Sequence, residues 1–163
     1  CALPICYALN GQMIGIGAGQ QSRVDCTKLA GRKAEIWHLR SLPRVRSLPF
    51  RDEVGNVVKT NARIAFIEGE MTAPERSSWL KLFKSNPREL SLEEKSESIS
   101  KMQEVCLSSD AFLPFRDNLD QASRRGVRYV VQRGGSLRDD LLIKAADEYG
   151  MLMAFSGIRL FHH

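Results

Sequence analysis

One short segment, Ile14–Arg23 with the sequence IGIGAGQQSR, constrains most strongly how this chain can fold. It predicts a buried strand that enters a glycine-rich turn and then opens a helix. The three glycines allow positive φ and a close approach of the backbone to another group. Ser22 can cap the helix, whose free N–H groups then favour an anion, and Arg23 adds a planar cation. The segment therefore predicts a site for an anionic small molecule.

The same turn has a second, purely structural interpretation. Glycines also permit a strand to pack tightly against the following helix without any ligand. The spacing is not the dinucleotide fingerprint G-x-G-x-x-G, because the third glycine comes one residue early, and no G-x-x-x-x-G-K-[ST] loop is present. Both interpretations of the turn stay open on the sequence alone.

Length and composition fit one globular domain. The chain has 163 residues, of which 43% are hydrophobic, enough for an ordinary core. No apolar run approaches the ~20 residues of a membrane span, so we expect no association with a membrane. Residues 1–6 are apolar but too short for a signal peptide, and they resemble the start of a strand cut from a longer chain.

The charge and the cysteines restrict the partners. The net charge of +5 favours anionic ligands. Basic residues between positions 40 and 51 alternate with leucine, proline and serine instead of gathering on one face with aromatics, so we do not expect nucleic-acid binding. The cysteines, Cys1, Cys6, Cys26 and Cys106, include no C-x-x-C pair, which disfavours a zinc ribbon. We expect reduced, mostly buried thiols in a cytoplasmic protein.

The hydrophobic pattern predicts strands that alternate with helices in an α/β domain. Strands are expected over residues 12–18, 105–108, 127–132 and 151–155, and helices over 22–39, 72–83, 91–104, 117–125 and 136–150. Thr72 and Ser91 each precede a glutamate by three residues, which is typical of a capping box. Residues 39–71 are expected as an irregular excursion with a short strand near 64–67. Alternation of this kind predicts a mainly parallel sheet with right-handed crossovers.

Three turns are expected at the carboxyl ends of parallel strands, where ligands bind in open α/β sheets. They cover residues 17–23, 110–117 and 133–136. In the second turn, Asp117 either caps the next helix or accepts hydrogen bonds from a heterocycle. Phe112 or Phe115 can stack on a ring there, and Arg116 is expected in a surface ion pair.

The third turn and the end of the chain are also candidate parts of a site. Arg133-Gly-Gly-Ser136 either binds an anion through its N–H groups or begins a helix that Ser136 caps. The tail, residues 157–163, is polar and aromatic and follows an apolar strand. We expect it to fold back into the site region.

Three motifs together resemble a known enzyme family. The sequences GIGAGQQSR, SSDAFLPFRDN and the terminal RLFHH are similar to the carboxy-terminal part of AICAR transformylase. This is the formyltransferase half of a bifunctional protein that also carries IMP cyclohydrolase, and the resemblance covers nearly the whole chain. It implies a three-layer α/β/α, cytidine-deaminase-like fold, with residues 1–163 as the second of two such copies. His162 and His163 match the family's own ending and are therefore expected to be native.

The resemblance also implies a reaction and its partners. The family transfers a formyl group from formyl-tetrahydrofolate to AICAR, giving FAICAR in purine biosynthesis, and it works as a homodimer with active sites at the interface. The implied nucleotide-binding residues are Arg23, Phe112 and Arg159, with Phe161 packed nearby, and the implied folate-binding residues are Val24, Asn61, Asp117, Ser136 and Leu137. Some members bind potassium through backbone carbonyls, and Asp110, Leu160 and His162 match part of that site.

Two departures from the family limit what this chain is expected to do alone. The family's catalytic Lys-His pair lies in the first copy of the fold, and nothing here matches it; His38 beside Trp37 is expected to pack. Leu3 stands where the family has an asparagine that holds the substrate carboxamide, and leucine makes no such hydrogen bonds. We therefore expect ligand contacts without formyl transfer by the isolated chain.

Two other function classes compete with this interpretation. A non-catalytic ligand-binding or dimerisation module is the alternative, favoured by the missing Lys-His pair and by Leu3. A zinc deaminase is disfavoured, because its H-x-E and P-C-x-x-C ligands are absent from the sequence.

Overall fold

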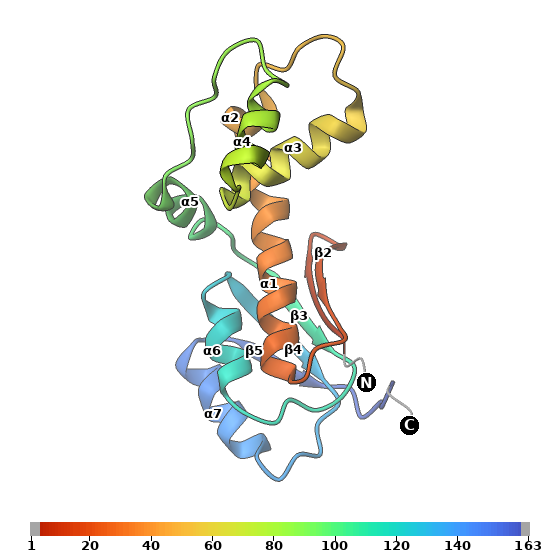
Figure 1. The fold of residues 1–163 in the computed structure, drawn as a ribbon. Helices are drawn as coiled ribbons and strands as arrows, with labels where there is room; N and C mark the ends of the chain where they lie inside the picture. The colour runs from red at the N-terminus through yellow and green to blue at the C-terminus, as the bar shows by residue number, and fades with distance from the viewer. Residues whose placement is uncertain (1–3, 161–163) are drawn as a thin grey trace. The chain divides into compact units, whose positions relative to one another are not determined.

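The computed structural model describes residues 4–160, which form two compact units. The first, which we call the sheet unit, comprises the chain up to Glu35 and from Ile99 onward. The second, the helical unit, comprises Ile36–Ser98. Figure 1 shows the fold of both units.

The sheet has five strands and is mixed. The strands are β1 (Ile5–Leu9), β2 (Gln12–Gly17), β3 (Val105–Ser109), β4 (Val127–Gln132) and β5 (Leu152–Phe155), in the order β2-β1-β3-β4-β5. Strand β1 runs antiparallel to both of its neighbours, whereas β3, β4 and β5 are parallel to one another. The α/β class is confirmed, but the prediction of a mainly parallel sheet is wrong.

A two-residue hairpin explains the direction of β1. Asn10 and Gly11, with φ of 51° and 76°, join β1 to β2. Positive φ at both central residues is typical of a type I′ turn, for which Asn-Gly is the favoured sequence. The prediction did not use this signal and so missed the hairpin.

The helices of the sheet unit lie side by side on one face of the sheet (Figure 1). They are α1 (Arg23–Leu39), α6 (Asp117–Ser123) and α7 (Asp139–Glu148). Thr27 of α1 hydrogen-bonds Asn118 of α6, and Tyr149, which ends α7, donates to Asp120 of α6. Beneath them the cross-strand row Tyr7, Leu107 and Val130 is fully buried.

The opposite face of the sheet is more open. Its row of Ala8, Cys106, Tyr129 and Leu152 includes side chains that are 41% (Tyr129) and 61% (Leu152) exposed. Within the described part of the sheet unit, no helix covers this face. The second helical layer of a three-layer α/β/α fold is therefore not present in those residues.

The helical unit corrects the expected excursion. It contains α2 (Pro43–Arg46), α3 (Asn56–Glu68), α4 (Ala73–Leu80) and most of α5 (Leu92–Ile99). The predicted strand at 64–67 is wrong, because those residues belong to α3. Ala62 and Phe66, four residues apart, bury the same side of that helix, and Gly69 ends it with φ of 74°. A short apolar run does not by itself distinguish a strand from a buried helix.

The remaining predicted elements are confirmed with shifted ends. Both capping boxes form, at Thr72 with Glu75 and at Ser91 with Glu94. Helix α5 ends at Ile99 and not near 104, and α7 begins at Asp139 rather than at 136. The N-cap of α7 is Arg138 and not Ser136, although Ser136 Oγ does accept the Arg138 N–H at 3.2 Å just before the helix. No helix within residues 4–160 is long and apolar enough to cross a membrane.

Candidate functional site

The three predicted turns meet at one edge of the sheet. Strands β2, β3 and β4 run in the same direction, so their carboxyl ends lie on the same side. Arg23, after the first turn, donates from Nη1 to Asp110 Oδ1 at 3.0 Å. The backbone N–H of Leu113, in the second turn, donates to Gln132 Oε1 at 2.7 Å, at the end of β4. These bonds confirm that the turns come together.

Arg23 is held as a buried cation at this edge. The residue is only 8% exposed, and its Nη1 donates to Ser109 Oγ at 2.8 Å as well as to Asp110. The pair of side chains is buried on both sides, at 7% and 9% exposure. No partner for Nε or Nη2 appears within residues 4–160, so those donors remain for a ligand anion.

The tail folds back over the same edge, as predicted. After β5, the N–H groups of Ser156 and Gly157 donate to the carbonyls of Gln132 and Arg133. The Leu160 N–H then reaches the Asp110 carbonyl at 3.2 Å. Arg159, between these contacts, is exposed. The predictions for Leu3, Phe161, His162 and His163 fall outside the described residues.

Asp117 does not cap the helix that it begins. The N-cap of α6 is Arg116, which makes no side-chain cap. The Asp117 carboxylate instead accepts from the Asn118 side chain, Nδ2 to Oδ1, at 2.9 Å. Arg116 is confirmed as an ion-pair residue, with Asp120 at 3.1 Å and Glu148 at 3.0 Å. The interpretation of Asp117 as the cap of α6 is therefore wrong.

The Gly134-Gly135 turn is closed to an outside anion in this structure. Asp139 Oδ2 accepts from the backbone N–H of Gly135 at 2.7 Å and of Ser136 at 3.1 Å. The chain's own carboxylate therefore occupies the position that the sequence analysis gave to a ligand. The anion interpretation of this turn is wrong for the conformation described.

Gly15 and Gly17 serve packing, whereas Gly19 has φ of 72° and open space around it. A Cβ on Gly17 would lie 2.0 Å from the Cys26 carbonyl oxygen, and one on Gly15 would lie 2.1 Å from that of Ala30. Ser22 caps α1 as predicted, with its Oγ accepting from the Asp25 N–H at 3.1 Å. The turn thus brings α1 into backbone contact with β2, and the site's positive charge comes from the Arg23 side chain.

The other predicted ligand residues differ in exposure. Phe112 is 39% exposed and Phe115 is 50% exposed, with Arg138 Cζ 4.6 Å from the centroid of the Phe115 ring. Both rings therefore stay candidates for stacking. Val24 is half-buried next to Arg23 on α1, and Leu137 is fully exposed.

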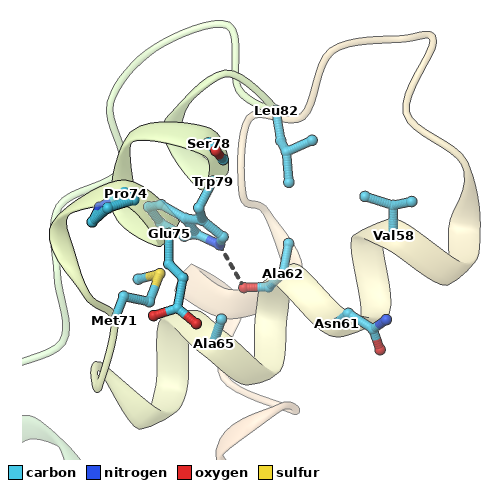
Figure 2. Close-up of a pocket in the computed structure, with 10 residues that line it drawn as sticks. All are labelled: Val58, Asn61, Ala62, Ala65, Met71, Pro74, Glu75, Ser78, Trp79 and Leu82. Atoms are coloured by element: carbon cyan, nitrogen blue, oxygen red, sulfur yellow. Dashed lines mark hydrogen bonds between the residues drawn. The ribbon is translucent and has the colours of Figure 1, made fainter.

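Asn61 lies in the helical unit, apart in the sequence from the other predicted residues. It lines a groove of about 610 Å³ between α3 and α4. Figure 2 shows this groove, with Trp79 donating from Nε1 to the Ala62 carbonyl at 2.9 Å. The sequence pattern did not predict this groove. No group of three metal-ligating side chains occurs among residues 4–160.

Two thiols lie on the open face of the sheet, Cys6 near this edge and Cys106 nearer the amino end of β3. Cys6 and Cys106 are half-buried, and Cys26 is fully buried. Burial raises the pKa of both half-buried thiols above the usual value, and the Asp110 carboxylate raises that of Cys6 further. A raised pKa means less of the reactive thiolate at neutral pH.

Alkylation by iodoacetamide should reveal these shifts. We expect Cys6 and Cys106 to react slowly at pH 8 and faster as the pH rises past 9, with Cys26 protected in the native state. Asp110→Asn should speed the reaction of Cys6, because it removes the nearby negative charge, and leave Cys106 as an internal control. Peptide mass spectrometry against pH measures each rate. Equal acceleration of both thiols would contradict the assignment to Asp110.

The start of the chain, which carries Arg23, is similar to a known protein family. Residues 4–33 match the family model described as AICARFT/IMPCHase bienzyme. The match spans the β1–β2 hairpin, the glycine turn and the first part of α1, and it includes Arg23 and Val24. This segment is similar to the family that the motifs indicated, and the match concerns the bienzyme as a whole rather than one of its parts.

Proposed function

We propose that this chain is part of an AICAR transformylase, which transfers a formyl group from formyl-tetrahydrofolate to AICAR in purine biosynthesis. The observation that carries the proposal is the buried Arg23–Asp110 pair at the carboxyl edge of the sheet, inside a segment similar to the AICARFT/IMPCHase family. A fixed guanidinium with free donors suits the phosphate of a nucleotide. The proposal includes the cytidine-deaminase-like fold, a homodimer and a cytoplasmic location.

Each residue of the site has a role in this proposal. Arg23 and Arg159 meet the anionic nucleotide, and Phe112 stacks on its ring. Asp117 accepts N–H donors of the folate heterocycle through its Oδ2, which has no partner within residues 4–160. The further folate contacts in the sheet unit are Val24, Ser136 and Leu137, and the folate role of Asn61, in the helical unit, stays a prediction.

The chemistry requires a group that this chain does not supply. The AICAR amine attacks the formyl carbon, the bond from that carbon to the folate nitrogen breaks, and the amine proton passes to that nitrogen. A base must carry the proton. In the family, a Lys-His pair in the other copy of the fold carries this proton. We propose that a segment with this Lys-His pair completes the site.

A potassium site at Asp110, Leu160 and His162 is a separate part of the proposal. The Asp110 carbonyl already accepts the Leu160 N–H, and its carboxylate is paired with Arg23. A carbonyl oxygen has two lone pairs, so the Asp110 carbonyl can accept this N–H and still face a cation. A site that includes His162 stays a prediction.

Calorimetric titration with AICAR and with a non-reactive folate analogue tests the proposal. We expect the chain to bind both ligands. Asp117→Asn should weaken the folate analogue about 10- to 100-fold, since hydrogen bonds to a charged acceptor contribute about 1.5–3 kcal/mol, and leave AICAR binding unchanged. Asp140→Asn, at an exposed position on α7, is the matched control.

The outcomes separate the function classes. Binding of neither ligand would favour the alternative, a purely structural or dimerisation module. Binding of both without formyl transfer fits a chain that needs the Lys-His segment. Turnover by the chain alone, followed as tetrahydrofolate production, would overturn the proposed source of the base.

A further inference from the structure

A buried amide lies directly behind the proposed folate carboxylate. Asn118, the second residue of α6, is only 1% exposed. Its Nδ2 donates to Asp117 Oδ1 at 2.9 Å and to the Phe115 carbonyl at 3.1 Å. Its Oδ1 accepts from the Thr27 hydroxyl at 2.9 Å. All of the hydrogen-bonding atoms of this amide are therefore engaged.

The partners fix which way the amide points. The carboxylate of Asp117 and the carbonyl of Phe115 only accept, so both require the NH₂ end of Asn118. The oxygen end must then face Thr27, which is fully buried on α1. The Thr27 hydroxyl has one proton, which Asn118 Oδ1 at 2.9 Å shares with the Arg23 carbonyl at 3.0 Å. If the amide were flipped, its oxygen would face the Asp117 carboxylate and the Phe115 carbonyl, which are also acceptors.

We infer that Asn118, held by Thr27, is a positioning residue for Asp117. Its NH₂ group ties down Oδ1 and leaves Oδ2 for the ligand. This inference rests on the proposed role of Asp117 in folate binding and deepens it. It also connects two parts of the site, because the anchor of the folate carboxylate sits one helical turn after Arg23, the proposed nucleotide contact.

A double substitution separates positioning from stability. Thr27→Val with Asn118→Leu replaces the polar pair by apolar groups of similar shape, which can be nearly neutral for folding. The Phe115 carbonyl still accepts the backbone N–H of residue 118, so it is not left unpaired. We expect thermal unfolding close to wild type, about tenfold weaker binding of the folate analogue, and unchanged AICAR binding.

A control and a second background make the test specific. Thr60→Val in α3 removes a hydroxyl bonded only to the carbonyl four residues before it, and should change neither ligand. In an Asp117→Asn background, Asn118→Leu should cause little further loss of folate binding, because its effect runs through Asp117. A merely structural role would give additive losses.

Each result is decisive. Wild-type protein that binds no folate analogue would refute the proposed function itself. If Asp117→Asn weakens the folate analogue but the Thr27 and Asn118 variants bind it like wild type, only the positioning role is overturned. The same holds if the Thr27 and Asn118 variants lose AICAR binding as strongly as binding of the folate analogue. If the double variant does not fold, Thr27→Val alone, which keeps the core volume, should still weaken the folate analogue selectively.

Discussion

Gly17→Val should unfold the sheet unit at a markedly lower temperature than wild type. A side chain at Gly17 would meet the Cys26 carbonyl oxygen at 2.0 Å and the Ala30 nitrogen at 2.9 Å. Both are backbone atoms of α1, so no rotamer change relieves the clash, and α1 must move off β2. We expect a loss of about 3 kcal/mol or more in the free energy of unfolding. This corresponds to about 6–12 °C in a chain of this size, measured by circular dichroism.

Gly55→Ser provides the control for this prediction. Gly55 has φ of −70° at the N-cap of α3, and a Cβ there would meet nothing within 4 Å. Serine is also a favoured N-cap residue, so the transition should change little. The ligand interpretation of the glycine turn makes a different prediction for Gly17→Val: lost anion binding at unchanged stability. That result would refute the packing interpretation.

Local signals predicted those elements whose ends are set by neighbouring residues. Ser22 and Thr72 mark helix starts that the structure confirms. Ser136 was predicted to cap α7, but Asp139, three residues later, takes the N–H groups of the Gly-Gly turn. Ser136 Oγ accepts the Arg138 N–H while Asp139 accepts those of Gly135 and Ser136, and the sequence alone does not say where the regular helix begins.

The direction of β1 and the contacts of the site depend on distant residues. The Asn10-Gly11 signal was present and unused, so that error was avoidable. The Arg23–Asp110 pair was not predictable, although each residue was singled out, because it exists only when β1 lies between β2 and β3. Asn118 was missed for the same reason: its partner Thr27 is 91 residues away.

Arg23→Met tests whether the buried ion pair is both structural and functional. It would leave the Asp110 carboxylate, 9% exposed, without its cation. Removing one partner of a buried pair costs about 3–5 kcal/mol, because the remaining charge stays desolvated. We expect a correspondingly lower thermal transition and strongly weakened AICAR binding. Lys84→Met, which breaks the exposed pair with Asp52, is the control and should leave the transition unchanged.

The double variant Arg23→Met with Asp110→Leu then separates the two roles. Replacing both charges by apolar groups often restores stability, so its transition should return toward wild type. AICAR binding should stay strongly weakened, since the buried cation is gone and only the exposed Arg159 of the two proposed nucleotide arginines remains. If the double variant is stable and binds AICAR normally, Arg23 serves only to neutralise Asp110. The nucleotide site must then lie elsewhere, and the proposed function would lose the observation that carries it.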